Sequence, residues 1–129
     1  MFVKAALVKE DLHDGKRLIE ALDKANFKVQ AALWFYLADS DEWRLYISSP
    51  FVEKEGPRKS YNFIQKILAR LAPPSSFSLT DITVLSPSSN LVKLMRVAVR
   101  TGPGISGIRF TRNVINNTLI EDAYIYRIV

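Results

Sequence analysis

The fold of this chain is predicted most directly by residues 28–49, KVQAALWFYLADSDEWRLYISS. Residues 28–37 and residues 43–49 each alternate between two sets of side chains, as a strand does because successive side chains point to opposite faces. The polar residues 39–42 lie between the two runs and form a turn. The stretch therefore predicts an antiparallel hairpin.

The same hairpin gathers large aromatic residues, namely Trp34, Tyr36, Trp43 and Tyr46. Exposed aromatic rings stack on nucleic-acid bases, whereas rings in a hairpin more commonly pack across the strands. Cross-strand packing is the favoured interpretation. The signature of RNA-recognition domains is absent from the sequence.

A second hairpin is predicted in residues 107–129. Residues 107–115 and 119–129 are rich in Ile, Val, Phe and Tyr, and Asn116-Asn117-Thr118 separates them. A further short strand is predicted at residues 81–86.

Three helices are predicted from apolar residues at three- and four-residue spacing. The first covers residues 9–25, the second begins at Pro57 and stops before Pro73, and the third begins near Leu91 and ends before Gly102.

Two segments beside these helices are less clearly patterned. The apolar residues 2–8 could form a strand or extend the first helix, and the extension is favoured. The charged residues 53–57 are interpreted as a connector.

The order of these elements is helix, two strands, helix, strand, helix and two strands. It predicts a single α+β domain over residues 1–129 with a largely antiparallel sheet of about five strands, made of two hairpins plus one strand. About three helices are expected to pack on one face of the sheet. Residues 71–78 are interpreted as a loop within the domain, because neither side alone is long enough for a comfortable core.

Composition excludes several classes of site. The chain has no Cys, which excludes disulfides, thiolate nucleophiles, iron–sulfur clusters and zinc ribbons. Its single His, His13, lies in a polar stretch and is interpreted as solvated; no GxSxG motif supplies a nucleophile for a triad. The sequence therefore predicts no catalytic residues.

No cofactor or metal is predicted either. Residues 102–107 have the spacing Gly-x-Gly-x-x-Gly, but they follow a helix and precede a strand, which is the reverse of the dinucleotide fingerprint. Asp39, Asp41 and Glu42 are hard oxygen ligands, yet the Gly and distal Glu of a calcium loop are missing. A solvated turn is favoured over a metal site.

The expected location is cytoplasmic, without a membrane partner. Residues 1–8 are apolar but too short for a secretory signal, and no run approaches the length that spans a bilayer.

The start of the second helix is the first candidate site for an anion. Arg58 and Lys59 lie in the first helical turn, where backbone N–H groups already make the potential positive, and Ser60 adds a donor. A bound phosphate or carboxylate would offset these charges. The alternative is that Glu53 and Glu55 fold back onto the pair, or that water screens it.

The third helix supplies the second candidate. Lys93, Arg96 and Arg100 are three and four residues apart, so they share one helical face that suits a phosphate backbone. An ordinary solvated face has the same pattern and is favoured.

The third candidate is the strand that holds Arg109 and Arg112. Arg112 alternates with Phe110 and other apolar residues, so it needs a partner or an open cleft. Pairing with Glu121 or Asp122 across the hairpin is favoured over an arginine that faces a ligand.

These observations favour a non-enzymatic module that binds an anionic partner, either nucleic acid or a protein assembly. The net charge of +5 supports this function, although no run concentrates it. The alternative is an enzyme for a phosphorylated or carboxylated small molecule, with Arg58, Arg109 or Arg112 as clamps and a carboxylate such as Asp122 as base. A homodimer is a further hypothesis, because residues 123–129 form an apolar strand that could expose a free edge.

Overall fold

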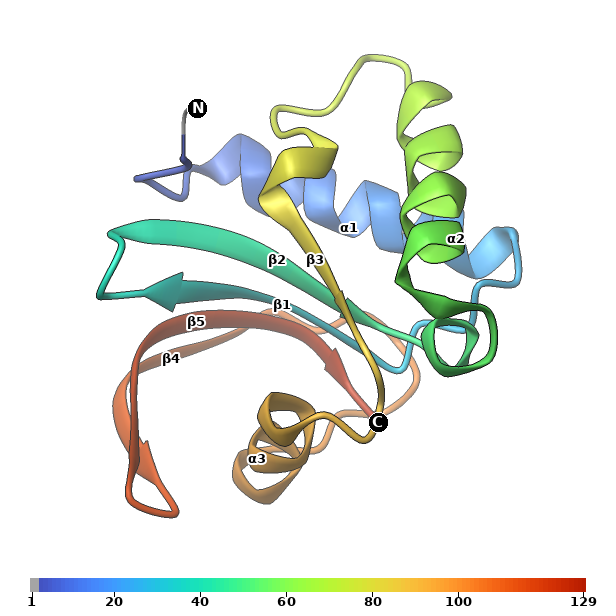
Figure 1. Cartoon of the computed structure of the whole chain (residues 1–129). Coiled ribbons are helices and arrows are strands. Elements are labelled where there is room, and N and C mark those ends of the chain that lie inside the picture. The colour runs from blue at the N-terminus through green and yellow to red at the C-terminus, as the bar shows by residue number, and fades with distance from the viewer. Residues whose placement is uncertain (1–2) are drawn as a thin grey trace.

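The computed structural model describes residues 3–129. Three α-helices, a short 3-10 turn and a five-stranded sheet make up this part of the chain (Figure 1). In chain order the elements are α1 (Lys9–Lys24), β1 (Ala31–Leu37), β2 (Glu42–Ser48), α2 (Pro50–Ala69), η1 (Leu79–Asp81), β3 (Ile82–Leu85), α3 (Asn90–Ala98), β4 (Ile108–Ile115) and β5 (Thr118–Ile128). The α+β class is confirmed.

Both predicted hairpins are confirmed. β1 pairs antiparallel with β2, and β4 pairs antiparallel with β5. The second hairpin turns at Asn116 and Asn117, whose φ angles of 47° and 63° are the left-handed values that a tight hairpin turn requires. Asparagine tolerates this conformation better than most residues.

The sheet is mixed, so the expectation of a largely antiparallel sheet is wrong. Its strand order is β3-β2-β1-β5-β4, and β3 runs parallel to β2. The physical reason is the connection between these two strands. α2 lies between them in the sequence and returns the chain to the end of the sheet at which β2 begins, so that β3 runs in the same direction as β2. A helical crossover of this kind joins parallel neighbours, whereas a short turn joins antiparallel ones.

The helices lie on both faces of the sheet, which corrects the expectation of one covered face. α1 and α2 pack with Ala32 and Trp34 on one face, while α3 packs with Ala31 and Leu33 on the other (Figure 1). The side chains of β1 are apolar on both faces of the sheet, so helices must pack on each face to bury them.

The predicted free edge at residues 123–129 is wrong, because β5 lies between β1 and β4. The edges are β3 and β4. At the β3 edge the N–H of Val84 donates to the hydroxyl of Tyr61 on α2, 3.1 Å away. A homodimer therefore stays a prediction without the edge that suggested it.

The starts of α1 and α2 differ from expectation. Residues 3–8 form neither helix nor strand, so the favoured extension of α1 is wrong over them; residue 2 lies outside the described residues. The predicted connector 53–57 is part of α2, in which Gly56 breaks the helical path with φ 86° and ψ 168°. Pro57 thus begins the second, longer part of α2, as predicted.

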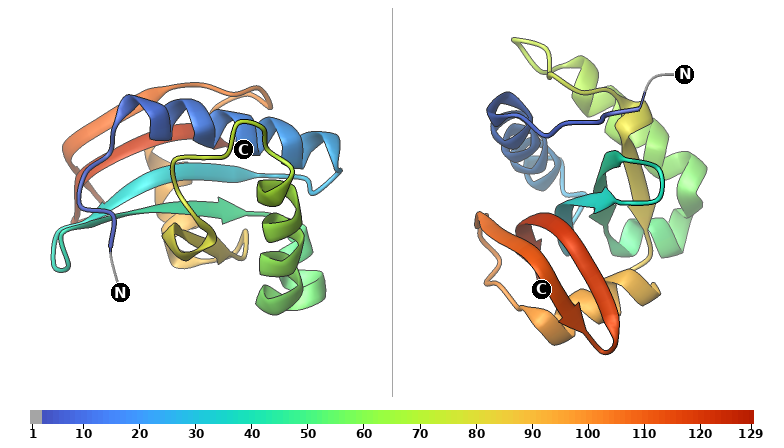
Figure 2. Two further views of the ribbon diagram at one scale, coloured as in Figure 1. Left: turned by 90° about the horizontal axis from the view of Figure 1, so that it is seen from above. Right: turned by 90° about the vertical axis from the view of Figure 1, so that its left-hand side faces the viewer.

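In residues 3–129, no helix combines the length and the apolar character that crossing a membrane requires. Figure 2 shows α1 lying along the strands, and the β4–β5 hairpin on the opposite side of the molecule from α2.

Candidate anion-binding groove

The second part of α2 carries a stripe of cations. Lys59, Lys66 and Arg70 are seven and four residues apart, which is close to two turns and one turn of helix. Their side chains therefore lie along one line, and all three are exposed. Arg70 is the residue directly after the last helical residue, where a cation is favourable for the helix dipole.

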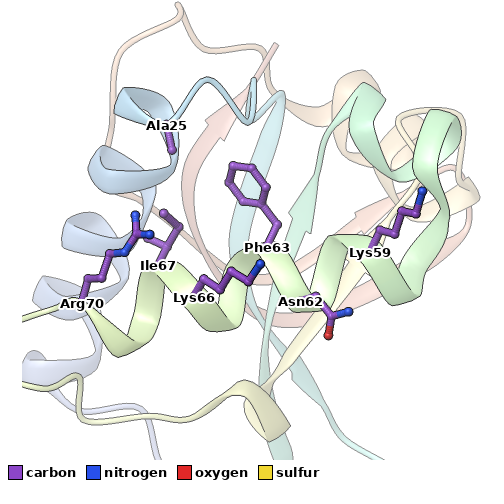
Figure 3. A pocket seen from close by; sticks show the side chains of 7 residues that line it. All are labelled: Ala25, Lys59, Asn62, Phe63, Lys66, Ile67 and Arg70. Carbon is purple, nitrogen blue, oxygen red and sulfur yellow. The ribbon is translucent and has the colours of Figure 1, made fainter.

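An apolar floor lies beside this stripe. Phe63 and Ile67 project from α2 on the side that faces Ala25, which follows the last residue of α1 (Figure 3). Ile67 is 7% exposed and belongs to the core, and Phe63 packs against the same core. The floor is thus fixed by the packing of α1 and α2 against the sheet.

Together these residues form a concave surface that we call the α1–α2 groove. Its main part has a volume of about 400 Å³ and continues past Ala25, Ile67 and Arg70 into a second depression beside α1. The groove is lined by Ala21, Lys24, Ala25, Lys59, Asn62, Phe63, Lys66, Ile67, Arg70 and Leu71.

The charged side chains that line the groove are all positive. Four cationic side chains line it and no carboxylate does. Lys59 pairs with Glu55 at 3.3 Å on the surface, an arrangement that contributes little energy in water. Among residues 3–129, no salt bridge holds Lys24, Lys66 or Arg70. The groove therefore combines unneutralised cations with an apolar floor.

The predicted anion site at the start of the helix is only partly available. Ser60 is buried, and its hydroxyl donates to the carbonyl of Gly56 at 2.7 Å, so it is occupied within the helix. Lys59 reaches Glu55, as the alternative interpretation expected, whereas Glu53 instead accepts hydrogen bonds from two serines before α3. Arg58 is exposed.

The predicted ridge on the third helix is incomplete. α3 ends at Ala98, so Arg100 lies outside it and does not continue the face of Lys93. The Arg96 guanidinium donates to the main-chain oxygens of Pro87 at 2.9 Å and Val129 at 3.0 Å. Lys93 is the exposed cation that remains on the helix itself. Arg96 therefore links α3 to the segment before it and to the residue that follows β5.

The ion pair predicted for Arg112 across the hairpin is made by the other arginine of β4. Arg109, rather than Arg112, pairs with Asp122 through two contacts of 2.6 Å, and it lies 5.5 Å from the ring centre of Trp43. This hydrogen-bonded pairing raises the pKa of Arg109. Arg112 is exposed with a left-handed φ of 50°. The pairing occupies both Asp122, the hypothetical base, and one of the hypothetical clamps.

The eight predicted residues are thus spread over the fold. Arg58, Lys59 and Ser60 belong to α2, while Lys93, Arg96 and Arg100 belong to α3 or the chain just after it, on the opposite face of the sheet. Arg109 and Arg112 lie on the edge strand β4. Of the eight, Lys59 alone lines the α1–α2 groove.

Two acidic side chains at the turn between β1 and β2 make contacts within the sheet. Tyr36 donates to Asp41 at 2.6 Å, which raises the pKa of Tyr36, and Arg44 pairs with Glu42 at 3.1 Å. Within the described part of the chain, no three acidic, histidine or cysteine side chains are grouped as a metal site would need.

Sequence reasoning missed three cations of the groove, Lys24, Lys66 and Arg70. The signal for two of them was present, because Lys59, Lys66 and Arg70 repeat at helical spacing just outside the apolar stripe of α2. Lys24 joins them through the packing of α1 beside α2, which no local pattern reveals.

The chain matches no protein-family model, no curated protein and no solved structure.

Proposed function

We propose that this chain is a non-enzymatic binding module and that the α1–α2 groove holds an anionic partner. The observation that carries the proposal is the gathering of four cations around one concave surface without a lining carboxylate. Three of these cations have no ion pair in residues 3–129, so their charge is available to a ligand. An anion bound there would neutralise them and displace weakly held counterions.

The test is fluorescence anisotropy with two labelled polyanions, a single strand of about 20 nucleotides and an acidic peptide, each at about 50 mM and about 200 mM salt. We expect at least one probe to bind, with an affinity that falls as salt increases. Where the probe is the oligonucleotide, the salt slope should lose about one unit for each removed phosphate contact.

Charge reversal identifies the surface that binds. The double variant Lys66→Glu, Arg70→Glu should abolish binding, whereas Lys93→Glu, Arg100→Glu changes net charge equally on exposed residues near α3 and should leave most of it. If neither polyanion binds the unmodified protein at low salt, the proposed function is wrong. If the α3 variant is the one that loses binding, the groove is the wrong site.

A further inference from the structure

The floor of the α1–α2 groove requires apolar groups from any ligand that fills it. Phe63 and Ile67 project from successive turns of α2 and Leu71 follows the end of that helix, while Ala21 of α1 and Ala25 just after it meet them from the other side. A purely ionic ligand would contact the cations and leave this surface in water. A ligand with one apolar face and one acidic side satisfies both halves of the groove.

The cations repeat with the period of an α-helix. Lys59, Lys66 and Arg70 span about three turns, or about 16 Å at the helical rise. Carboxylates seven and four residues apart on a second helix have the same spacing along its axis. On a helix lying beside α2, each carboxylate would therefore lie opposite one cation. Paired helices of coiled coils place opposite charges beside their apolar seam in the same way.

The groove offers only one aromatic ring among its lining residues, and that ring is partly buried. Phe63 is held in a cluster with Phe27, 4.9 Å between ring centres, and with Phe51, 5.4 Å away. Single-stranded nucleic acid is held by successive bases that stack on several aromatic rings. One ring surrounded by alanine, isoleucine and leucine side chains favours aliphatic groups instead.

From these three observations, we infer that the partner is an acidic amphipathic α-helix of another protein. This inference rests on the proposed function and specifies its ligand. Leucine-like side chains of the partner lie over Phe63 and Ile67, and its carboxylates face Lys59, Lys66 and Arg70. The charges select and orient the helix, while the apolar floor supplies buried area.

A synthetic helix tests the inference directly. The probe is a labelled peptide of about 18 residues, a length of about five turns, with leucines at three- and four-residue spacing. Glutamates seven and four residues apart run along one side of the leucine stripe. The control peptide has the same composition, but its glutamates lie on the face opposite the leucines.

Binding is measured by anisotropy, and peptide helix content by circular dichroism of the mixture. We expect the designed peptide to bind about tenfold more tightly than the control and to gain helix on binding. In the protein, Lys66→Glu and Arg70→Glu should each weaken binding about tenfold. A peptide with lysines in place of the facing glutamates should restore binding to the double variant, because the contacts are pairwise.

Two outcomes overturn the inference and leave the proposed function standing. One is equal affinity for the designed and control peptides, because charge alone would then account for binding. The other is an oligonucleotide that binds through Lys66 and Arg70 when the designed peptide does not. Absence of binding by every polyanion at low salt would instead remove the proposed function itself.

Discussion

At Gly15, α1 lies close against two residues of the sheet, Trp34 and Tyr126. The hydroxyl of Tyr126 donates to the carbonyl of Leu12 at 2.7 Å and accepts from the indole N–H of Trp34 at 3.0 Å. Burial of this hydroxyl raises the pKa of Tyr126, so the phenol stays protonated and able to donate. A side chain at Gly15 would occupy the space of the Tyr126 hydroxyl.

Gly15→Ala should therefore destabilise the fold. The added Cβ would overlap the Tyr126 hydroxyl and crowd Trp34, so the helix must shift or the hydrogen bonds must break. Overpacking of this kind costs about 1–3 kcal/mol, which urea denaturation measures as a lower midpoint. Gly102→Ala is the matched control, because a Cβ there meets nothing within 4 Å, and its stability should be unchanged or slightly higher. Equal stability of the two variants would contradict the close approach.

Asp14 makes the stability of the fold depend on acid pH. Burial acts to raise its pKa, but hydrogen bonds from Arg17 at 3.0 Å and from the N–H of Ser76 at 2.9 Å outweigh burial and lower the pKa below its usual value. The folded state therefore favours the charged carboxylate. This contribution to stability is present above the usual pKa of 3.8 and is lost as pH falls through the lower folded value.

Asp14→Asn should remove that dependence. We expect the variant to be less stable than the unmodified protein at neutral pH, with the difference in unfolding free energy shrinking between about pH 4 and about pH 2. Urea denaturation across this range measures it. A difference that stays constant with pH would show that the Asp14 carboxylate titrates alike in the folded and unfolded chains.

At the scale of elements, most of the strands and helices were predictable because their signals are local. The hairpin strands show alternation, and Asn116-Asn117 marks a turn. The first part of α2 was missed because its charged residues resemble a connector, although Ser49 caps it by accepting from the N–H of Phe51 at 3.1 Å and Pro50 begins it. The parallel placement of β3 depends on where α2 packs, so it is invisible locally.

Asn117→Gly should strengthen the β4–β5 hairpin. Asn117 has a φ of 63°, and glycine adopts this left-handed conformation without the strain of a Cβ. We expect a gain of about 0.5 kcal/mol in unfolding free energy by thermal or urea denaturation, and a loss for Asn117→Val, whose branched side chain resists positive φ. A loss of stability in the glycine variant would contradict this turn geometry.

At the scale of the whole molecule, the candidate site depends on packing between elements. The helical spacing of Lys59, Lys66 and Arg70 can be read from the sequence, but their association with Lys24 requires α1 and α2 to lie on the same face. The predicted cations of α3 lie on the other face for the same reason. Local patterns place a residue on an element, whereas the face of the sheet that each element covers is set by packing between elements.

The two cores share strand β1, so the sheet should unfold as one unit. Both tryptophans, Trp34 and Trp43, belong to the core under α1 and α2, whereas Met95 of α3 is fully buried in the core on the opposite face. Met95→Ala should lower the stability reported by tryptophan fluorescence by about 2–5 kcal/mol, although no tryptophan lies in that core. Far-UV circular dichroism should give the same midpoint. Val97→Ala, at a position of α3 that is 62% exposed, should change stability by less than about 0.5 kcal/mol. The contrary result would be an unchanged tryptophan transition in Met95→Ala, with part of the circular dichroism signal lost at a lower denaturant concentration. The two faces would then unfold as independent units, because the shared strand would fail to couple them.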